Sequence, residues 1–431
     1  MKKILQIYLE LKPAVMFLPF LILYVLIILK VSTHELVGDE GRYYEFANNL
    51  LNGYYSPPAP NINLWSGPGY PIFLVPFVWL KMPLLVIKLA NAFLQYFSIV
   101  LLFLAINKYT SKTYALILSF FWALYYISYQ ELPLMLTEPL TSFLSALIVF
   151  FIAQTNSSES SKTKYFVLAG FAIGFLSLTK IIFGYVILSL IMFYGLLLLF
   201  RKSKNEGRKG FFVIMVALLI NVPYLIYTYN LTGKVFYWGN SGGSSLYWMS
   251  TPIEGEFGEW NNATFTANYG HDPKIPNNAS LFAINHQKDM DYVAQYPVIN
   301  QDDQLKKIAF NNIKTHPVKY LRNCVSNVSR IFFGIPNSYF YQREQTAMRL
   351  LPNSIILSLL IFCSIITAIN FRTIKPEIRM VIGLTFLYLF FSTLVSAYPR
   401  QLYVIIPFLF FWASYIMHKS LTFTLKFSKE E

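Results

Sequence analysis

The chain alternates between long apolar blocks and short polar segments that carry most of its charge. Uninterrupted apolar runs occur, for example, at residues 17–29, 84–106 and 355–369. Roughly 20 apolar residues are needed to cross the hydrocarbon core of a bilayer, whereas a core helix of a soluble protein has polar residues every turn or two. The pattern therefore predicts an all-α polytopic membrane protein.

About ten segments are apolar enough to be predicted as transmembrane helices. They lie near residues 13–31, 84–106, 114–129, 138–153, 165–179, 181–200, 211–229, 351–370, 379–396 and 400–418. The first is predicted to be an uncleaved span, because no small-residue cleavage site follows it. A further apolar stretch, residues 71–80, is too short to cross and is predicted to be re-entrant or interfacial.

Basic residues mark the cytoplasmic side. The formal net charge is +14, but the lysines and arginines gather in alternate short loops, and residues 201–209 hold five basic residues against one acidic residue. Such a bias orients membrane proteins with the basic loops inside, so both ends of the chain are expected in the cytoplasm. A nucleic-acid partner would need a basic face on a folded domain, and the distribution argues against one.

Three regions follow from this topology. They are an N-terminal transmembrane region (1–229) with a first outer loop (32–83), an extracytoplasmic loop region (230–350) and a C-terminal transmembrane region (351–431). The large loop contains Trp238, Trp248 and Trp260 and is too aromatic for a disordered linker. Its aromatic residues fit either stacking on sugars or anchoring at the membrane interface.

The first outer loop holds the most informative stretch, Gly-Asp-Glu-Gly-Arg-Tyr-Tyr at residues 38–44. Apolar positions after it recur at helical spacing, and Gly53 provides a stop. The pattern predicts a short interfacial helix with two adjacent carboxylates, Asp39 and Glu40, at its start. Helix capping and the helix dipole also explain acidic residues at that position.

Three further charged residues lie at predicted outer ends of spans: Glu138, Lys180 and Arg400. A carboxylate at that depth is costly unless it is paired or bound. Lys180 and Arg400 are basic residues on the predicted outer side, which departs from the positive-inside pattern. They fit snorkelling to lipid head groups, or joint binding of an anionic lipid phosphate.

These features resemble, in their order along the chain, the GT-C type glycosyltransferases, in particular protein O-mannosyltransferases and aminoarabinose transferases. The resemblance rests on Asp39-Glu40, Gly67-Pro68-Gly69-Tyr70-Pro71, Glu138, Leu178-Thr179-Lys180 and Tyr398-Pro399-Arg400 with Pro407. The chain departs from the usual family pattern at two places, and both bear on which subfamily it resembles. Gly67-Pro68 stands where a double proline is usual, and Lys180 stands where arginine is common.

The resemblance implies an enzyme that moves a hexose or pentose from a polyprenyl-phosphate carrier to a lipid, glycan or protein acceptor outside the cytoplasm. Asp39 would act as general base or orient the acceptor hydroxyl, and Glu40 would support it. Glu138, Lys180, Arg400, Tyr43 and Tyr70 are predicted to bind the substrates. The chemistry agrees, because the attacking hydroxyl needs a base and the departing phosphate needs positive charge. A single displacement of this kind inverts the anomeric centre.

Several alternatives stay open at this point. No metal ligand is assigned, although one of His34, His271, His286 and His316 could join Asp39 or Glu40 at a divalent metal. A flippase or another transporter would place charges deep in several spans and show repeated halves. A polymerase of lipid-linked oligosaccharides would share the location and the lipid substrate, and the early Asp-Glu motif is the main argument against it. The expected location is a bacterial plasma membrane, with the active site facing outside.

Overall fold

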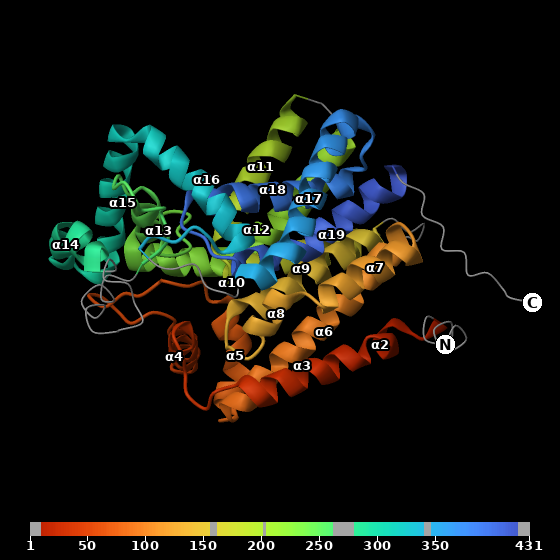
Figure 1. Ribbon diagram of the computed structural model, residues 1–431, viewed down its shortest axis with the longest axis horizontal. Helices are drawn as coiled ribbons and strands as arrows, with labels where there is room; N and C mark the ends of the chain where they lie inside the picture. The colour runs from red at the N-terminus through yellow and green to blue at the C-terminus, as the bar shows by residue number, and fades with distance from the viewer. Residues whose placement is uncertain (1–9, 156–161, 201–203, 262–279, 340–345, 421–431) are drawn as a thin grey trace, which may run out of the picture.

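All regular structure is helical in the computed structural model, which describes residues 10–155, 162–200, 204–261, 280–339 and 346–420 (Figure 1). The helices are α2 (Pro13–Met16), α3 (Leu18–Val31), α4 (Asp39–Leu51), α5 (Gly69–Trp79), α6 (Leu84–Tyr109), α7 (Lys112–Ala123), α8 (Tyr126–Glu131), α9 (Thr137–Gln154), α10 (Lys162–Thr179), α11 (Ile182–Leu199), α12 (Lys204–Thr232), α13 (Gly242–Met249), α14 (Ser280–Ala294), α15 (Val298–Thr315), α16 (Pro317–Phe333), α17 (Thr346–Asn370), η4 (Phe371–Thr373), α18 (Pro376–Leu394) and α19 (Arg400–Ser420).

Among the described residues, seven helices are long and apolar enough to cross a membrane: α6, α9, α11, α12, α17, α18 and α19. The apolar helices α3, α5 and α10 are shorter. The prediction of an all-α multi-pass membrane protein is therefore confirmed. The predicted number of ten spans stays a prediction.

Two predicted spans are interrupted. Residues 13–31 divide into α2 and α3 next to Pro19, which lacks the N–H that a continuous helix would use. Residues 114–129 divide at Ala123, where the hydroxyls of Tyr24 and Tyr129 donate to the Ala123 carbonyl oxygen at 2.7 and 2.9 Å. These tertiary hydrogen bonds satisfy a carbonyl that the break exposes, and the hydrophobic pattern gives no sign of them.

Helix α19 forms the centre of the bundle. It packs against α6, α7, α9, α17 and α18, and 83% of its apolar window is buried within the protein. Helix α17 lies at the outside, with only 17% of its apolar window buried. A residue at the start of α19 is therefore held by the most enclosed of the seven long helices.

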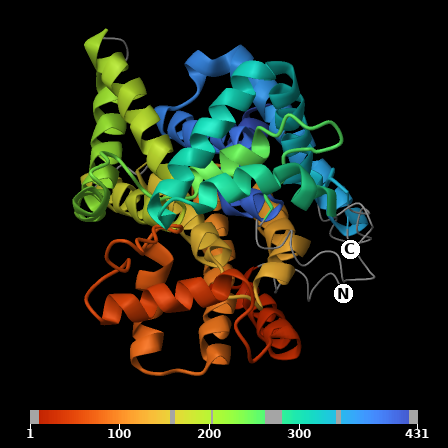
Figure 2. The same ribbon diagram turned by 90° about the vertical axis from the view of Figure 1, so that its left-hand side faces the viewer.

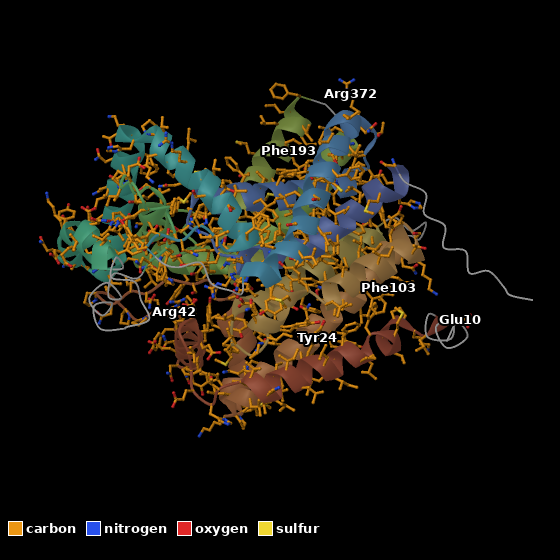
Figure 3. All side chains as sticks on the ribbon, viewed as in Figure 1. Glu10, Tyr24, Arg42, Phe103, Phe193 and Arg372 are labelled. Carbon is orange, nitrogen blue, oxygen red and sulfur yellow. The ribbon has the colours of Figure 1, made fainter. Side chains whose placement is uncertain are left out.

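The first outer loop and the basic connection between α17 and α18 lie toward opposite ends of this bundle. Figure 3 shows Arg42, from α4, at the left-hand end and Arg372, from the α17–α18 connection, at the upper right. The basic connection between α6 and α7 lies at the end away from α4, because Lys88, near the start of α6, contacts the first turn of α4. The predicted alternation of inner and outer loops stays a prediction.

The two predicted outer segments both fold into helices at the α4 end. Figure 2, which faces this end, shows α4 and α5 below the group formed by α13 to α16. The large segment has its own core around Tyr247, Trp248 and Phe282. Trp238 is also fully buried and donates to Asn221 at 2.8 Å. These two loop tryptophans are therefore core residues.

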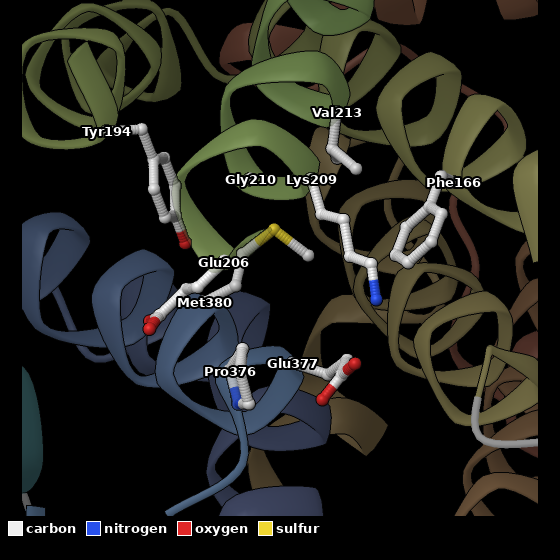
Figure 4. Close-up of a pocket in the computed structure, with 9 residues that line it drawn as sticks. All are labelled: Phe166, Tyr194, Glu206, Lys209, Gly210, Val213, Pro376, Glu377 and Met380. Carbon is white, nitrogen blue, oxygen red and sulfur yellow. The ribbon is translucent and has the colours of Figure 1, made fainter. Parts of the chain in front are cut away.

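A small cavity between α10, α11, α12 and α18 lies at the opposite, basic end (Figure 4). It is lined by polar residues including Tyr194, Glu206 and Glu377, and Arg379 pairs with Glu206 at 2.9 Å beside it. Its volume of about 20 Å³ is enough for about one water molecule. It is too small for a sugar.

The glycines of the Gly-Pro-Gly return allow close packing on the end of α10. A Cβ atom on Gly69 would lie 2.3 Å from the Thr179 hydroxyl and 2.7 Å from the Thr179 nitrogen. A Cβ on Gly67 would lie 2.1 Å from the Leu178 carbonyl oxygen. These two sequence motifs, far apart along the chain, therefore form one backbone contact next to Lys180.

We predict that Gly69→Ala lowers the stability of the protein by about 1–3 kcal/mol, because the new methyl group overpacks this contact. Gly41→Ala is the matched control, since a Cβ there meets no atom within 4 Å. Thermal unfolding of the purified variants in detergent would measure the difference. Equal melting temperatures for the two variants would contradict the proposed close contact.

Candidate functional site

The site begins at Asp39, the first residue of α4. Gly38 precedes it with φ = 58°, a left-handed conformation that glycine adopts without strain. The Asp39 carboxylate pairs with Arg42 one turn later at 2.9 Å. Its other oxygen pairs with Arg400, at the start of α19, at 3.1 Å. The first outer loop is thereby joined to the last predicted outer turn.

A second carboxylate, Glu138 in the first turn of α9, lies on the other side of Arg400. Its Oε1 is 2.7 Å from the Lys180 ammonium and 3.7 Å from Arg400 Nε. The Glu138 side chain is 1% exposed, whereas Lys180 is 20% exposed and Arg400 is 32% exposed. The buried carboxylate therefore holds two cations whose outer surfaces stay accessible.

The pKa of Asp39 lies below its usual value. Burial raises the pKa of this carboxyl group, but attraction to Arg42 and Arg400 outweighs the effect of burial. Asp39 is therefore ionised at neutral pH. A carboxylate has about four acceptor positions, so the two arginines leave room for a hydrogen bond from a substrate hydroxyl.

Glu131, at the end of α8, is a further carboxyl group near this cluster that was not predicted from the sequence. Burial and the negative charge of Glu138 raise the pKa of Glu131 to about 7, despite the nearby cations. Its Oε2 atom is buried and has no hydrogen-bond partner among the described residues. Glu131 can therefore change charge near neutral pH.

Glu40 forms no ion pair with Arg42, Lys180 or Arg400 among the contacts of the described residues and has other partners. Its two oxygens accept hydrogen bonds from the backbone nitrogens of Val37 at 2.8 Å and Met135 at 2.7 Å. Lys88 of α6 lies 3.4 Å from Glu40, and both side chains are fully buried. Glu40 thus ties α4 to α6 and to the connection that leads to Glu138. This geometry favours a structural role for Glu40 over direct contact with a substrate.

Tyr43 and Tyr70, which the sequence analysis predicts to bind the substrates, lie beside the charged groups. The rings of Tyr43 and Tyr70 meet edge to face with centroids 5.1 Å apart. Tyr70 is fully buried and Tyr43 is 8% exposed, so both form a wall of the site in this state. Their roles in substrate binding stay predictions.

Two tryptophans that meet edge to face, Trp65 and Trp260, lie beside the site. Trp65 lies under the Arg42 guanidinium at 5.8 Å, and its ring centroid is 6.5 Å from that of Trp260. The Trp260 carbonyl oxygen accepts a hydrogen bond from Tyr398 at 2.9 Å, two residues before Arg400. Trp260 is therefore the half-buried tryptophan of the large loop that reaches the site, in contrast to Trp238 and Trp248.

The described residues contain no group of three or more His, Cys, Asp and Glu side chains close enough to hold a metal ion. His286 pairs with Glu256 at 2.9 Å and with Tyr247 at 2.6 Å inside the large outer segment. His271 lies outside the described residues. The Asp39 and Glu138 carboxylates pair with cations, which makes them a poor donor set for a divalent metal.

We predict that Lys88→Met destabilises the protein by about 3–5 kcal/mol, because it leaves Glu40 buried without its counterion. The double variant Glu40→Gln/Lys88→Met should be less destabilised than Lys88→Met alone. Lys234→Met is a suitable control, because its pair with Asp303 is about one-third exposed and such pairs contribute about 0–1 kcal/mol. Unchanged thermal unfolding of Lys88→Met would contradict the assigned role of the pair.

The sequence matches no protein-family model and none of the curated proteins. Solved structures do match. The archaeal oligosaccharyltransferase AglB from Archaeoglobus fulgidus, in complex with an inhibitory peptide and a dolichol-phosphate, is 12% identical with a TM-score of 0.50; the match covers 96% of this chain and 52% of that chain. ArnT from Cupriavidus metallidurans, bound to undecaprenyl phosphate, is 13% identical with a TM-score of 0.42, covering 93% of this chain and 77% of that chain.

The chain spans about half the length of the archaeal enzyme. At this level of identity the likeness shows the fold alone. The helical architecture and the match to AglB agree with the resemblance drawn from the motifs. The chain has the fold of the GT-C type membrane glycosyltransferases.

Proposed function

We propose that the chain is a glycosyltransferase that moves a sugar from a polyprenyl-phosphate carrier to an acceptor hydroxyl, with inversion at the anomeric carbon. The observation that carries the proposal is a cluster of four charged groups. Arg400 pairs with both Asp39 and the buried Glu138, and Lys180 also pairs with Glu138. They come from the starts of α4, α9 and α19 and from the end of α10. The structure of AglB with a dolichol-phosphate supports a lipid phosphate as the carrier.

Lys180 and Arg400 would bind the phosphate. The phosphodiester of the donor carries one negative charge, and the departing monoester carries up to two. Two partly exposed cations therefore stabilise the products of bond breaking more than the substrate. Glu138 keeps both side chains in place, and a bidentate guanidinium suits phosphate oxygens.

Asp39 would act on the acceptor. The acceptor oxygen attacks the anomeric carbon, its proton passes to Asp39, and the bond between the anomeric carbon and the phosphate oxygen breaks. The electron pair of that bond stays on the phosphate, next to Lys180 and Arg400. Arg42 and Arg400 fix the orientation of the Asp39 carboxylate, as a general base requires.

The proposal includes the side of the membrane. The basic connections lie at the end of the bundle opposite Asp39, and such connections face the cytoplasm. The reaction would therefore take place on the extracytoplasmic side, which for a bacterial protein is the outer face of the plasma membrane.

We predict that Asp39→Asn lowers transfer by about 10²–10⁴-fold, the usual contribution of a general base, while the donor still binds. The assay is transfer of radiolabelled sugar from a panel of polyprenyl-phosphate donors into a membrane extract. Asp303→Asn, which alters an exposed ion pair in α15, is the control and should keep its activity.

Transfer by the native protein but not by Asp39→Asn would support the proposed reaction. Absence of transfer from every donor, with both proteins folded and binding lipid, would contradict it and favour a transporter. Equal transfer by the two proteins would contradict the role of Asp39 alone.

We also predict a pH dependence that comes from Glu131. Below pH 7 this carboxyl group is protonated and neutral, and above pH 7 it adds a negative charge close to Lys180 and Arg400. Donor affinity should therefore fall as the pH rises from 6 to 8, by roughly threefold to tenfold for about 1 kcal/mol of charge repulsion. The phosphodiester of the donor keeps its charge in this range, so the change reports on the protein.

The measurement is the donor dissociation constant at several pH values for the native protein and for Glu131→Gln. The variant should bind with nearly constant affinity, because the glutamine stays neutral. The same fall in affinity for both proteins would show that another group is responsible.

A further inference from the structure

Helix α16 has its apolar side facing outward. Val318, Leu321, Val325 and Val328 are spaced by three, four and three residues, and their exposed fractions are 62%, 63%, 73% and 39%. This spacing places them on one face of the helix. An amphipathic helix that faced water on its outer side would show the opposite pattern.

The inner face of α16 is polar, and its groups have partners within the protein. Asn323 donates to the carbonyl oxygens of Met249 and Thr251 at 3.0 and 3.1 Å. Arg330 donates to the Phe257 carbonyl oxygen at 3.1 Å. The inward orientation of these side chains is therefore fixed by hydrogen bonds, and the apolar stripe must face away from the protein.

The helix also connects to the site. Asn327 donates to the carbonyl oxygens of Ser392 and Val395 at 3.0 and 2.6 Å, and accepts from the Ala397 nitrogen at 3.0 Å. These residues form the end of α18 and the turn that precedes Arg400. Helix α16 therefore lies at the same end of the bundle as Asp39.

The neighbours of α16 indicate what covers its apolar stripe. α16 packs against the long apolar helices α17, α18 and α19, and it crosses the direction of α9 and α19 in Figure 1 instead of running along them. The neighbouring α17 exposes Leu351 and Ile355, by 73% and 41%, on a helix that is apolar enough to face the bilayer. The apolar surface of α16 thus lies beside a surface that lipid must cover.

We propose that α16 lies in the membrane interface, with the Val318–Val328 stripe inserted among lipid acyl chains. Exposure of four aliphatic side chains to water would be unfavourable, whereas a helix of this kind is stable at the boundary between head groups and acyl chains. The exposed Arg322 lies beside the stripe, where its long side chain can reach the lipid phosphates. The lipid surface would then support the turn that carries Arg400.

Site-directed spin labelling in phosphatidylcholine–phosphatidylglycerol vesicles tests this proposal. Nitroxide labels are placed at Leu321→Cys and Val325→Cys, and collision rates with oxygen and with a water-soluble nickel chelate are measured. Ile361→Cys on the exposed side of α17 is the lipid control, and Lys288→Cys on α14 is the water control. The two native cysteines, Cys324 and Cys363, are buried. The protein without introduced cysteines is therefore treated with the same reagent to measure background labelling.

The labels on α16 should collide more with oxygen than with the chelate, as at Ile361 and unlike Lys288. Preference for the chelate would place the stripe in water and overturn the proposal. Low collision with both reagents would mean that protein, such as a second copy of the chain, covers the stripe, which would also overturn it. Val318→Cys and Val328→Cys replace any variant that does not fold.

Discussion

The arrangement of this protein depends on the position of the Arg400 guanidinium between the carboxylates of Asp39 and Glu138. A cation and a carboxylate near the end of a buried helix are costly unless each has partners. The two carboxylates come from different segments, so satisfying Arg400 brings the starts of α4, α9 and α19 together. Lys180 completes the arrangement by pairing with Glu138. The same contacts that satisfy these charges leave two cations partly accessible.

Three contacts outside the charged cluster hold the segments of the cluster in position. The buried Glu40–Lys88 pair fixes α4 on α6, Asn327 holds the turn before Arg400, and Gly69 allows α5 to meet the end of α10 beside Lys180. Each contact acts on a different segment of the site. The site is therefore preorganised by backbone hydrogen bonds and close packing, as stabilisation of a developing charge requires.

The sequence predicted the helical class, the region of most apolar helices, and Asp39, Glu138, Lys180 and Arg400 of the charged cluster, because apolar runs and isolated charges at their ends are local features. It did not predict the partners. Asp39 and Glu40 are adjacent in sequence, yet one faces the cluster and the other is buried beside Lys88. Lys88 could have been selected as an isolated charge in a predicted span. Glu131 and the break at Ala123 depend on neighbours from distant segments, which hydrophobic periodicity does not contain.

The most direct test of this account is equilibrium binding of undecaprenyl phosphate to the purified protein at fixed pH and salt. The account predicts that Lys180→Gln and Arg400→Gln each weaken binding by about tenfold or more, the size expected for one charge-assisted hydrogen bond. The control Lys234→Gln removes an equal charge from the outer segment and should bind as the native protein does. Equal affinity for all four proteins would contradict the central claim that Lys180 and Arg400 hold the lipid phosphate.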